Sequence, residues 1–137
     1  ESFENKTGTL VDYIMKDSDM RQAVIANESS GKQAKLKYKV LDEMLIHNDM
    51  YSLVDVELIS GRFHQIRFQF AHHKHPLLGD TKYGEQIENK EYFLGLYAYQ
   101  IEFSHPITEE LLVFNLKPKH HYFLDYKGIN NIDWRPL

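Results

Sequence analysis

The chain has 137 residues, 42% of them hydrophobic, which is enough for one modest core and too little for several domains. Its formal net charge of −4 argues against a protein whose whole surface binds nucleic acid, because such domains are strongly basic. No cysteine is present and no apolar run is long enough to cross a bilayer, so disulfides, thiolate metal sites and membrane contacts are not expected, and we predict a cytoplasmic protein.

The first thirty residues carry the weakest pattern in the chain. We expect a short helical or extended piece near residues 10–15 and a short strand or sheet edge at Val24 and Ile25. Residues 27–31 read Asn-Glu-Ser-Ser-Gly, a composition typical of an exposed turn. No domain boundary is needed in this part of the chain.

Residues 33–41 alternate between apolar and basic side chains, as a half-buried strand requires. Lys35, Lys37 and Lys39 share one face, and the residues between them share the other. Residues 31–39 hold four lysines and no acid, so positive charge is local here although the chain as a whole is acidic. The lysines either contact successive phosphates of a nucleic-acid backbone or only make the solvent-exposed face of a sheet soluble. The pattern does not separate these two interpretations.

A second alternating run follows an acidic, polar connection over residues 42–50. It places Val54, Val56 and Leu58 on the inner face of a strand. We expect this strand to pair antiparallel with the preceding one, so that the segment that follows starts at the end of the sheet.

Residues 61–84 concentrate glycine, arginine and histidine as no other segment does. Phe63, Ile66 and Phe70 fall at the spacing of one helical face, so the pattern predicts a strand, a tight turn and then a helix. We expect Gly61 to supply the backbone angles that other residues avoid at such a turn.

The start of this helix is predicted to face phosphate. The first amides of a helix have no internal partner and attract anions. Arg62 lies beside these amides, and His64 and Arg67, three residues apart, share one side of the helix. Composition alone favours another interpretation, a surface helix with solvated charges.

A histidine cluster follows at residues 72–75, but we expect no metal site there. A zinc site needs three or four converging ligands, and adjacent His72 and His73 point about 100° apart on a helix. Asp80 is predicted to hold a turn by bonding nearby backbone amides, not to act as a catalytic acid. Residues 85–91 are polar and are expected to form a loop.

The last third of the chain predicts a hairpin. Residues 93–103 and 111–116 have strand-like patterns, and residues 104–108 between them have the composition of a turn. Residues 119–126 can form one or two helical turns that end at Gly128.

The segment from residue 60 to residue 84 resembles the third signature motif of the RluA-type pseudouridine synthases. That motif reads (Thr/Ser)-Gly-Arg-x-His-Gln-(Ile/Leu)-Arg and continues into His-Pro-(Ile/Leu)-Leu-Gly-Asp-x-x-Tyr-Gly. The chain departs from it at Lys74, where a glycine is common, and at Ser60, where threonine is more usual. A weaker similarity extends over most of the chain. The matching residues are Ser60, Gly61, Arg62, His64, Gln65, Ile66, Arg67, His75, Pro76, Leu77, Leu78, Gly79, Asp80, Tyr83 and Gly84.

The resemblance implies an α+β fold, a mixed and mainly antiparallel sheet with flanking helices, in which residues 1–137 form a single domain. It also implies isomerisation of uridine to pseudouridine in ribosomal or transfer RNA, without a metal or an organic cofactor. The family places a catalytic aspartate in an upstream His-Arg-Leu-Asp motif, which does not occur here. The chain therefore looks like the C-terminal part of the catalytic domain, a fragment expected to be inactive by itself.

The resemblance also assigns roles to single residues. Arg67 is the catalytic residue, because it would pair with the aspartate and hold it ionised and oriented. Leu78 would pack against the uridine once that base has left its stack. The other motif residues would position the RNA backbone or form the pocket wall. Together with two strand lysines, the residues predicted to contact RNA are Arg62, His64, Gln65, Leu78, Lys35 and Lys37.

Two other interpretations stay open. One is a non-catalytic RNA-binding module that keeps the groove and has lost the chemistry. The other is a metal-binding or protein-interaction domain built on the histidine cluster, although partly protonated histidines beside an RNA site explain that cluster better. An upstream aspartate motif in the reading frame would favour the enzyme, and stoichiometric zinc would favour the metal site. No obligate protein partner is inferred.

Overall fold

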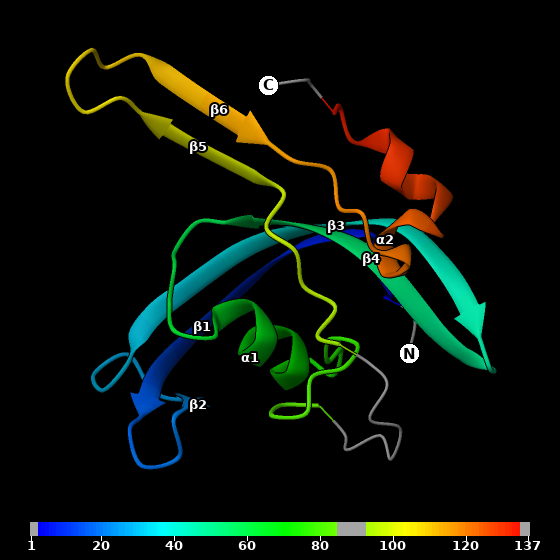
Figure 1. Cartoon of the computed structure of the whole chain (residues 1–137). Coiled ribbons are helices and arrows are strands. Elements are labelled where there is room, and N and C mark those ends of the chain that lie inside the picture. The colour runs from blue at the N-terminus through cyan, green and yellow to red at the C-terminus, as the bar shows by residue number, and fades with distance from the viewer. Residues whose placement is uncertain (1–2, 85–92, 135–137) are drawn as a thin grey trace.

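The computed structural model describes residues 3–84 and 93–134. Four strands form one antiparallel sheet in the order β2-β1-β3-β4, and β5 and β6 form a separate two-stranded hairpin. Figure 1 shows the four-stranded sheet curving around α1, while the β5–β6 hairpin extends away from the sheet on its other side. The elements in chain order are β1 (Thr7–Asp17), β2 (Gln22–Ile25), β3 (Lys32–Ile46), β4 (Asp49–Leu58), α1 (Gln65–His72), β5 (Gln100–Ser104), β6 (Leu111–Asn115), α2 (His121–Leu124) and the 3-10 helix η1 (Lys127–Asn131).

The predicted fold class, a mainly antiparallel sheet with flanking helices, is confirmed for the described residues. The loop expected over residues 85–91 lies outside these residues. None of the described helices is long and apolar enough to cross a membrane.

β3 and β4 pair antiparallel, as their alternating patterns predict. Both strands are longer than expected, however, and the predicted connection over residues 42–50 is wrong. The ladder shifts between Val40 and Asp42, and a bulge of this kind puts the following residues out of step with the alternation. Only His47 and Asn48 join the two strands, and their φ angles of 48° and 69° are those of a tight hairpin turn.

The first thirty residues form the long strand β1 and the short edge strand β2. Of the two structures expected near residues 10–15, the extended one is correct, and β2 includes the predicted Val24 and Ile25. The predicted turn over residues 27–31 is confirmed, because the side chain of Asn27 accepts hydrogen bonds from the amides that follow it. The full length of β1 was not predictable, since its apolar residues do not alternate strictly.

The main core lies between β3 and α1. Leu36 and Val40 of β3 pack with Phe70 of α1 and with Phe3, and none of these residues is more than 9% exposed. The inner face predicted for β4 is correct except at Leu58, which is 48% exposed. Leu58 ends the edge strand of the sheet, where fewer neighbours are available to cover it.

The hairpin of the last third of the chain is confirmed, but its first strand is shorter than expected. The ladder begins only at Gln100. Tyr97 and Tyr99 precede the ladder: the ring of Tyr97 lies against Phe123, the hydroxyl of Tyr99 donates to Asp55, and the carbonyl oxygen of Tyr99 accepts from the amide of Leu116. The predicted helical turn within residues 119–126 is α2, but the predicted end at Gly128 is wrong, because the 3-10 helix η1 runs through this residue.

Candidate functional site

The turn from β4 into α1 has its left-handed residue at a position that differs from the predicted one. The sequence predicts unusual backbone angles at Gly61, but Gly79 is the only described glycine with a positive φ. The left-handed residue is His64, with a φ of 52°, directly before the first helical residue Gln65. Phe63 precedes the helix and is 40% exposed, so it does not belong to the apolar helix face. The turn, not the helix periodicity, therefore directs the His64 ring.

Gln65 braces this turn from inside the protein, where it is almost fully buried. Its Oε1 accepts from the amide of Arg62 at 2.9 Å and from the hydroxyl of Ser60 at 3.1 Å. Its Nε2 donates to the carbonyl oxygen of Lys35 at 3.1 Å. These bonds tie the turn to β3, so the structure places Gln65 in support of the site. Its contact with RNA stays a prediction.

Arg67 and Asp80 form a two-point ion pair. Nε of Arg67 donates to Oδ2 at 3.0 Å, and Nη2 donates to Oδ1 at 2.9 Å. The Arg67 side chain is 20% exposed and the Asp80 side chain is fully buried. The predicted turn role of Asp80 is confirmed, because Oδ1 also accepts from the amides of Lys82 and Tyr83. Sequence reasoning missed the ion pair, since no local pattern indicates which arginine a turn aspartate will meet.

The two charges of this pair stabilise each other. Burial by itself would raise the pKa of the Asp80 carboxyl. The hydrogen bonds from Arg67 and from the amides of Tyr83 and Lys82 outweigh burial, and the pKa of Asp80 lies below its ordinary value. The hydrogen bond to Asp80 likewise raises the pKa of Arg67. Both groups are therefore charged throughout the neutral pH range.

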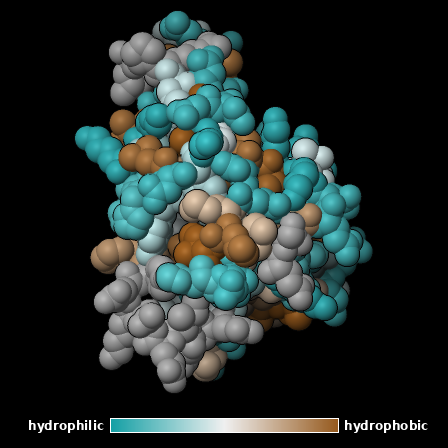
Figure 2. All heavy atoms as spheres, turned by 90° about the vertical axis from the view of Figure 1, so that its right-hand side faces the viewer, coloured by the Kyte–Doolittle hydropathy of each residue, from teal (hydrophilic) through white to brown (hydrophobic). Residues whose placement is uncertain are grey.

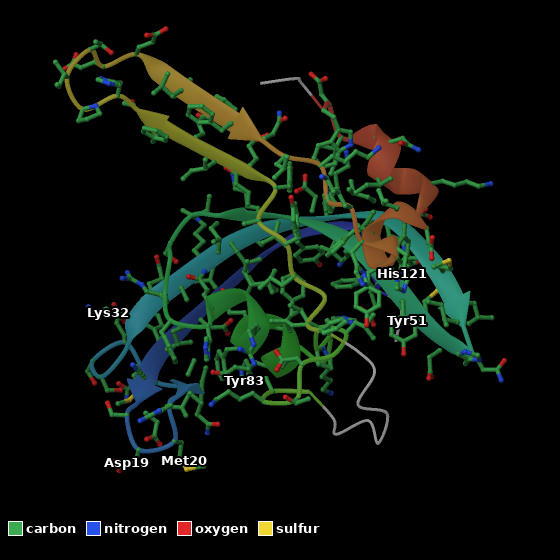
Figure 3. All side chains as sticks on the ribbon, in the orientation of Figure 1. Asp19, Met20, Lys32, Tyr51, Tyr83 and His121 are labelled. Carbon is green, nitrogen blue, oxygen red and sulfur yellow. The ribbon has the colours of Figure 1, made fainter. Side chains whose placement is uncertain are left out.

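Tyr83 joins Arg67 to His64. Its hydroxyl accepts the amide hydrogen of Ala23 at 2.7 Å and lies 2.8 Å from Nδ1 of His64. The guanidinium carbon of Arg67 lies 5.2 Å from the centre of the Tyr83 ring, within the range of a cation–π contact. Figure 3 shows Tyr83 next to α1. Sequence reasoning gave Tyr83 no role, although its fixed place in the family motif was the signal that could have found it.

Three positive charges and one negative charge act on His64. Burial is the first cause that lowers the pKa of His64, and the charges of Arg67, Lys82 and Lys16 lower it further, while the carboxylate of Asp80 opposes them. Nζ of Lys16 lies 4.4 Å from the centre of the Phe63 ring, which stacks on the His64 ring. The imidazole is therefore neutral at pH 7, and the two lysines are additions to the site that the sequence pattern did not reveal.

Arg62 takes a different direction from the other predicted site residues. Its Nε donates to the carbonyl oxygen of Gln33 on β3 at 2.9 Å. The predicted group of two guanidiniums and one imidazole is thus only partly formed. The described contacts link His64 and Arg67 through Tyr83, and they link Arg62 to β3 instead.

Lys35 and Lys37 lie on the face of β3 that points away from the core. In the ladder, Lys37 stands opposite Glu57 and Lys39 stands opposite Asp55. Opposite charges at facing positions stabilise a sheet, so pairing within the sheet explains the positions of Lys37 and Lys39 without RNA. Contact of Lys35 and Lys37 with RNA stays a prediction.

Leu78 lines a cavity of about 240 Å³ near the turn between β3 and β4. Figure 3 shows Tyr51 and His121 at this end of the molecule, and Figure 2 shows on the same side a hydrophobic patch with hydrophilic side chains below it. Contact of Leu78 with a base stays a prediction, and no described contact joins this cavity to Arg67. The other lining residues are Met44, Ile46, Tyr51, His121, Tyr122, Asp125 and Tyr126.

The adjacent histidines at the end of α1 point to different partners. Nε2 of His73 lies 2.9 Å from Oδ2 of Asp12, whereas the ring of His72 stacks on Phe68. In residues 3–84 and 93–134, no three metal-binding side chains come together. The geometry of the cluster therefore gives no support to the metal interpretation.

Comparisons with known proteins point to one family. The sequence profile of the family described as RNA pseudouridylate synthase matches residues 2–72. The chain belongs to the RNA pseudouridylate synthase family. Uncharacterized RNA pseudouridine synthase MG209 of Mycoplasma genitalium is 37% identical over 107 residues, covering 77% of this chain and 33% of that protein. RNA pseudouridine synthase 5 of Oryza sativa subsp. japonica is 50% identical over 71 residues, covering 52% of this chain and 17% of that protein.

A solved structure shares the fold of this pseudouridylate synthase family member. Human RNA Pseudouridylate Synthase Domain Containing 1 matches with a TM-score of 0.72 at 23% identity, covering 84% of this chain and 49% of that one. The chain spans about a third of the Mycoplasma protein and about half of the human chain, so both contain segments with no counterpart in these 137 residues. The family named by the motif resemblance is confirmed.

Proposed function

We propose that this chain supplies the arginine half of the active site of a pseudouridine synthase that isomerises uridine in RNA. The observation that carries the proposal is the position of Arg67. Its guanidinium is partly exposed, and only one of its edges is occupied by Asp80. The other edge has no hydrogen-bond partner among the described residues. A second anionic group can therefore bind Arg67 without displacing Asp80.

In the reaction of this family, the uracil leaves its ribose and is rejoined to it through carbon. The family uses an aspartate for this step, and the 137 residues contain no His-Arg-Leu-Asp motif. A guanidinium within bonding distance favours the ionised form of a carboxylate and fixes its direction. In our proposal, Arg67 acts in this way on an aspartate from a segment that lies outside these residues.

The positive surroundings of His64 are the proposed contact with RNA. Lys16, Lys82 and Arg67 all contribute positive potential at this imidazole. A local patch of this kind can bind a phosphate chain although the formal net charge of the protein is −4. Similar proteins are named tRNA pseudouridine synthase C and Ribosomal large subunit pseudouridine synthase D. We therefore propose transfer or ribosomal RNA as the substrate class.

In this proposal, residues 1–137 are the C-terminal part of one catalytic domain. The chain alone binds RNA without modifying it, because positioning groups without the aspartate leave no group to perform the reacting step. The cytoplasmic location expected from the composition stays a prediction.

The catalytic test compares the chain alone with a joined enzyme, in which residues 1–137 follow a segment that carries the family's His-Arg-Leu-Asp motif. Both are incubated with transcribed transfer or ribosomal RNA, and pseudouridine is detected by chemical labelling. We expect product from the joined enzyme only, and none after Arg67→Ala. Pseudouridine formed by the chain alone would show that the catalytic aspartate lies within these residues.

The binding test measures the affinity of the chain for RNA at several salt concentrations. The logarithm of the affinity should fall linearly with the logarithm of the salt concentration. Lys16→Ala or Lys82→Ala should each flatten this slope by roughly one phosphate's share, about 0.7 for a single strand. Lys127→Ala on η1 is the matched control, and an equal effect of this variant would show that the binding charge is not confined to the proposed site.

A further inference from the structure

The ion pair between Arg67 and Asp80 fixes the orientation of the guanidinium as well as its charge. A guanidinium carries five N–H donors in one plane. Asp80 accepts two of them, one from Nε and one from Nη2, and so occupies one edge of that plane. The ring of Tyr83 lies against the group, 5.2 Å from Cζ. The remaining donors, two on Nη1 and one on Nη2, lie along the edges that Asp80 leaves open.

Asp80 is itself held in one position. Its side chain is fully buried, and Oδ1 also accepts from the amides of Lys82 at 3.0 Å and Tyr83 at 3.1 Å. Gly79, directly before it, has a φ of 74°, and a Cβ there would collide with the backbone of Phe93. Only glycine fits this position, so the loop that buries Asp80 has a conformation that the sequence specifies.

We propose that Asp80 is a positioning residue, which holds the guanidinium of Arg67 so that its open edge meets one carboxylate. This inference rests on the proposed function, in which that carboxylate is the catalytic aspartate. An arginine side chain that is already fixed does not have to be ordered during the reaction. Asp80 also compensates part of the positive charge of Arg67, and this compensation weakens the attraction of Arg67 for phosphate.

The first test uses the unaltered chain. In the ¹⁵N-labelled chain, we expect the Nε–H signal of Arg67 to exchange slowly with solvent, because it is bonded to a buried carboxylate. Arg67→Lys identifies the signal by its loss. Arg21, which is exposed, provides the rapidly exchanging reference in the same spectrum. Exchange of the Arg67 signal as fast as that of Arg21 would overturn the proposal.

The second test measures two properties of the Asp80→Asn variant, its kcat and the salt dependence of its RNA binding. A general loss of structure would weaken both turnover and RNA binding. In the joined enzyme, kcat should fall by about 10²-fold with little change in KM, because the guanidinium loses its fixed orientation. In the chain alone, the salt dependence of RNA binding should become steeper by up to about 0.7, because Arg67 is released to bind phosphate. A loss of both turnover and RNA binding would indicate a merely structural role and would overturn the proposal.

Asp17→Asn is the matched control. Asp17 accepts from the amides of Asp19 and Met20, so it holds the same kind of turn without an arginine partner among the described contacts. We expect neither property to change in this variant. If Asp80→Asn leaves kcat unchanged while Arg67→Ala abolishes turnover, Asp80 is not a positioning residue and the proposed function stands. If Arg67→Ala itself leaves turnover unchanged, the proposed function fails.

Discussion

The surroundings of α1 and the β5–β6 hairpin differ in what holds them in place. Around α1, buried polar side chains bond to distant parts of the chain, as Gln69 does when it donates to the side chain of Asp12 and the carbonyl oxygen of Ala34. In the hairpin, apolar side chains are exposed, with Ile101 at 61% and Phe103 at 42%. The site is thus fixed by contacts between distant segments, whereas the described hairpin depends mainly on its own ladder.

The hairpin gathers apolar side chains on one face. Ile101 stands opposite Phe114 and Phe103 stands opposite Leu112, so all four side chains point to the same side. The rings of Phe103 and Phe114 stack on each other. A two-stranded hairpin by itself is only marginally stable in water. Equivalent substitutions should therefore cost much more around α1 than in the hairpin.

The largest difference is expected between Phe70→Ala and Phe114→Ala. Phe70 is 4% exposed between α1 and β3, and its truncation should lower the free energy of unfolding by about 3–5 kcal/mol. Phe114 is 45% exposed, so the same change should cost less than about 1 kcal/mol. Urea unfolding of both variants provides the measurement. Equal losses would contradict the proposed difference between the two regions.

A smaller effect is expected when the polar contacts of α1 are removed. Gln69→Met keeps the length of the side chain but leaves the carbonyl oxygen of Ala34 and the carboxylate of Asp12 without this donor. The free energy of unfolding should fall by about 1–3 kcal/mol. Gln100→Met in the exposed strand β5 is the matched control and should change it by no more than about 0.5 kcal/mol. Wild-type stability of Gln69→Met in thermal and urea unfolding would show that these bonds contribute little.

Tyr99 connects the two regions, and it predicts a weaker, pH-dependent effect. Burial, followed by the hydrogen bond to Asp55, raises the pKa of Tyr99 to about 12. As the pH rises above 10, the folded protein keeps a proton that the unfolded chain releases, so this contribution to stability falls with rising pH. Urea midpoints at about pH 9 and about pH 11 should differ less in Tyr99→Phe than in the wild type. Gln100→Met, which alters the neighbouring residue but removes no titrating group, should keep the wild-type difference.

Local patterns in the sequence were sufficient to predict some elements and failed at identifiable places. The alternation of Lys35, Leu36 and Lys37 predicted β3 because one face of this strand is buried against α1. The bulge after Val40 hid the second half of β3, since alternation cannot be followed through an inserted residue. The length of β1 depends on its pairing with β2 and β3, which no local pattern contains.

For the site, the family motif supplied the residue identities and the structure supplied their connections. His64 and Arg67 were predicted to share one side of the helix, and they do meet, but through the ring and hydroxyl of Tyr83. The pairing of Arg67 with Asp80 and the bond from Ala23 to Tyr83 join segments that are 13 and 60 residues apart. Such contacts follow from the fold as a whole, so a sequence pattern does not predict them.

The smallest effect is expected for Ile101→Thr in the hairpin, compared with Ile14→Thr in β1. Both changes keep a β-branched residue, so the intrinsic preference for a strand is similar. Ile14 is 3% exposed, and a buried hydroxyl without a partner there should cost about 1–3 kcal/mol. Ile101 is 61% exposed, so its replacement should change the free energy of unfolding by no more than about 0.5 kcal/mol. If Ile101→Thr costs as much as Ile14→Thr in urea unfolding, the apolar face of the hairpin is covered in solution, and the contrast with the surroundings of α1 does not hold.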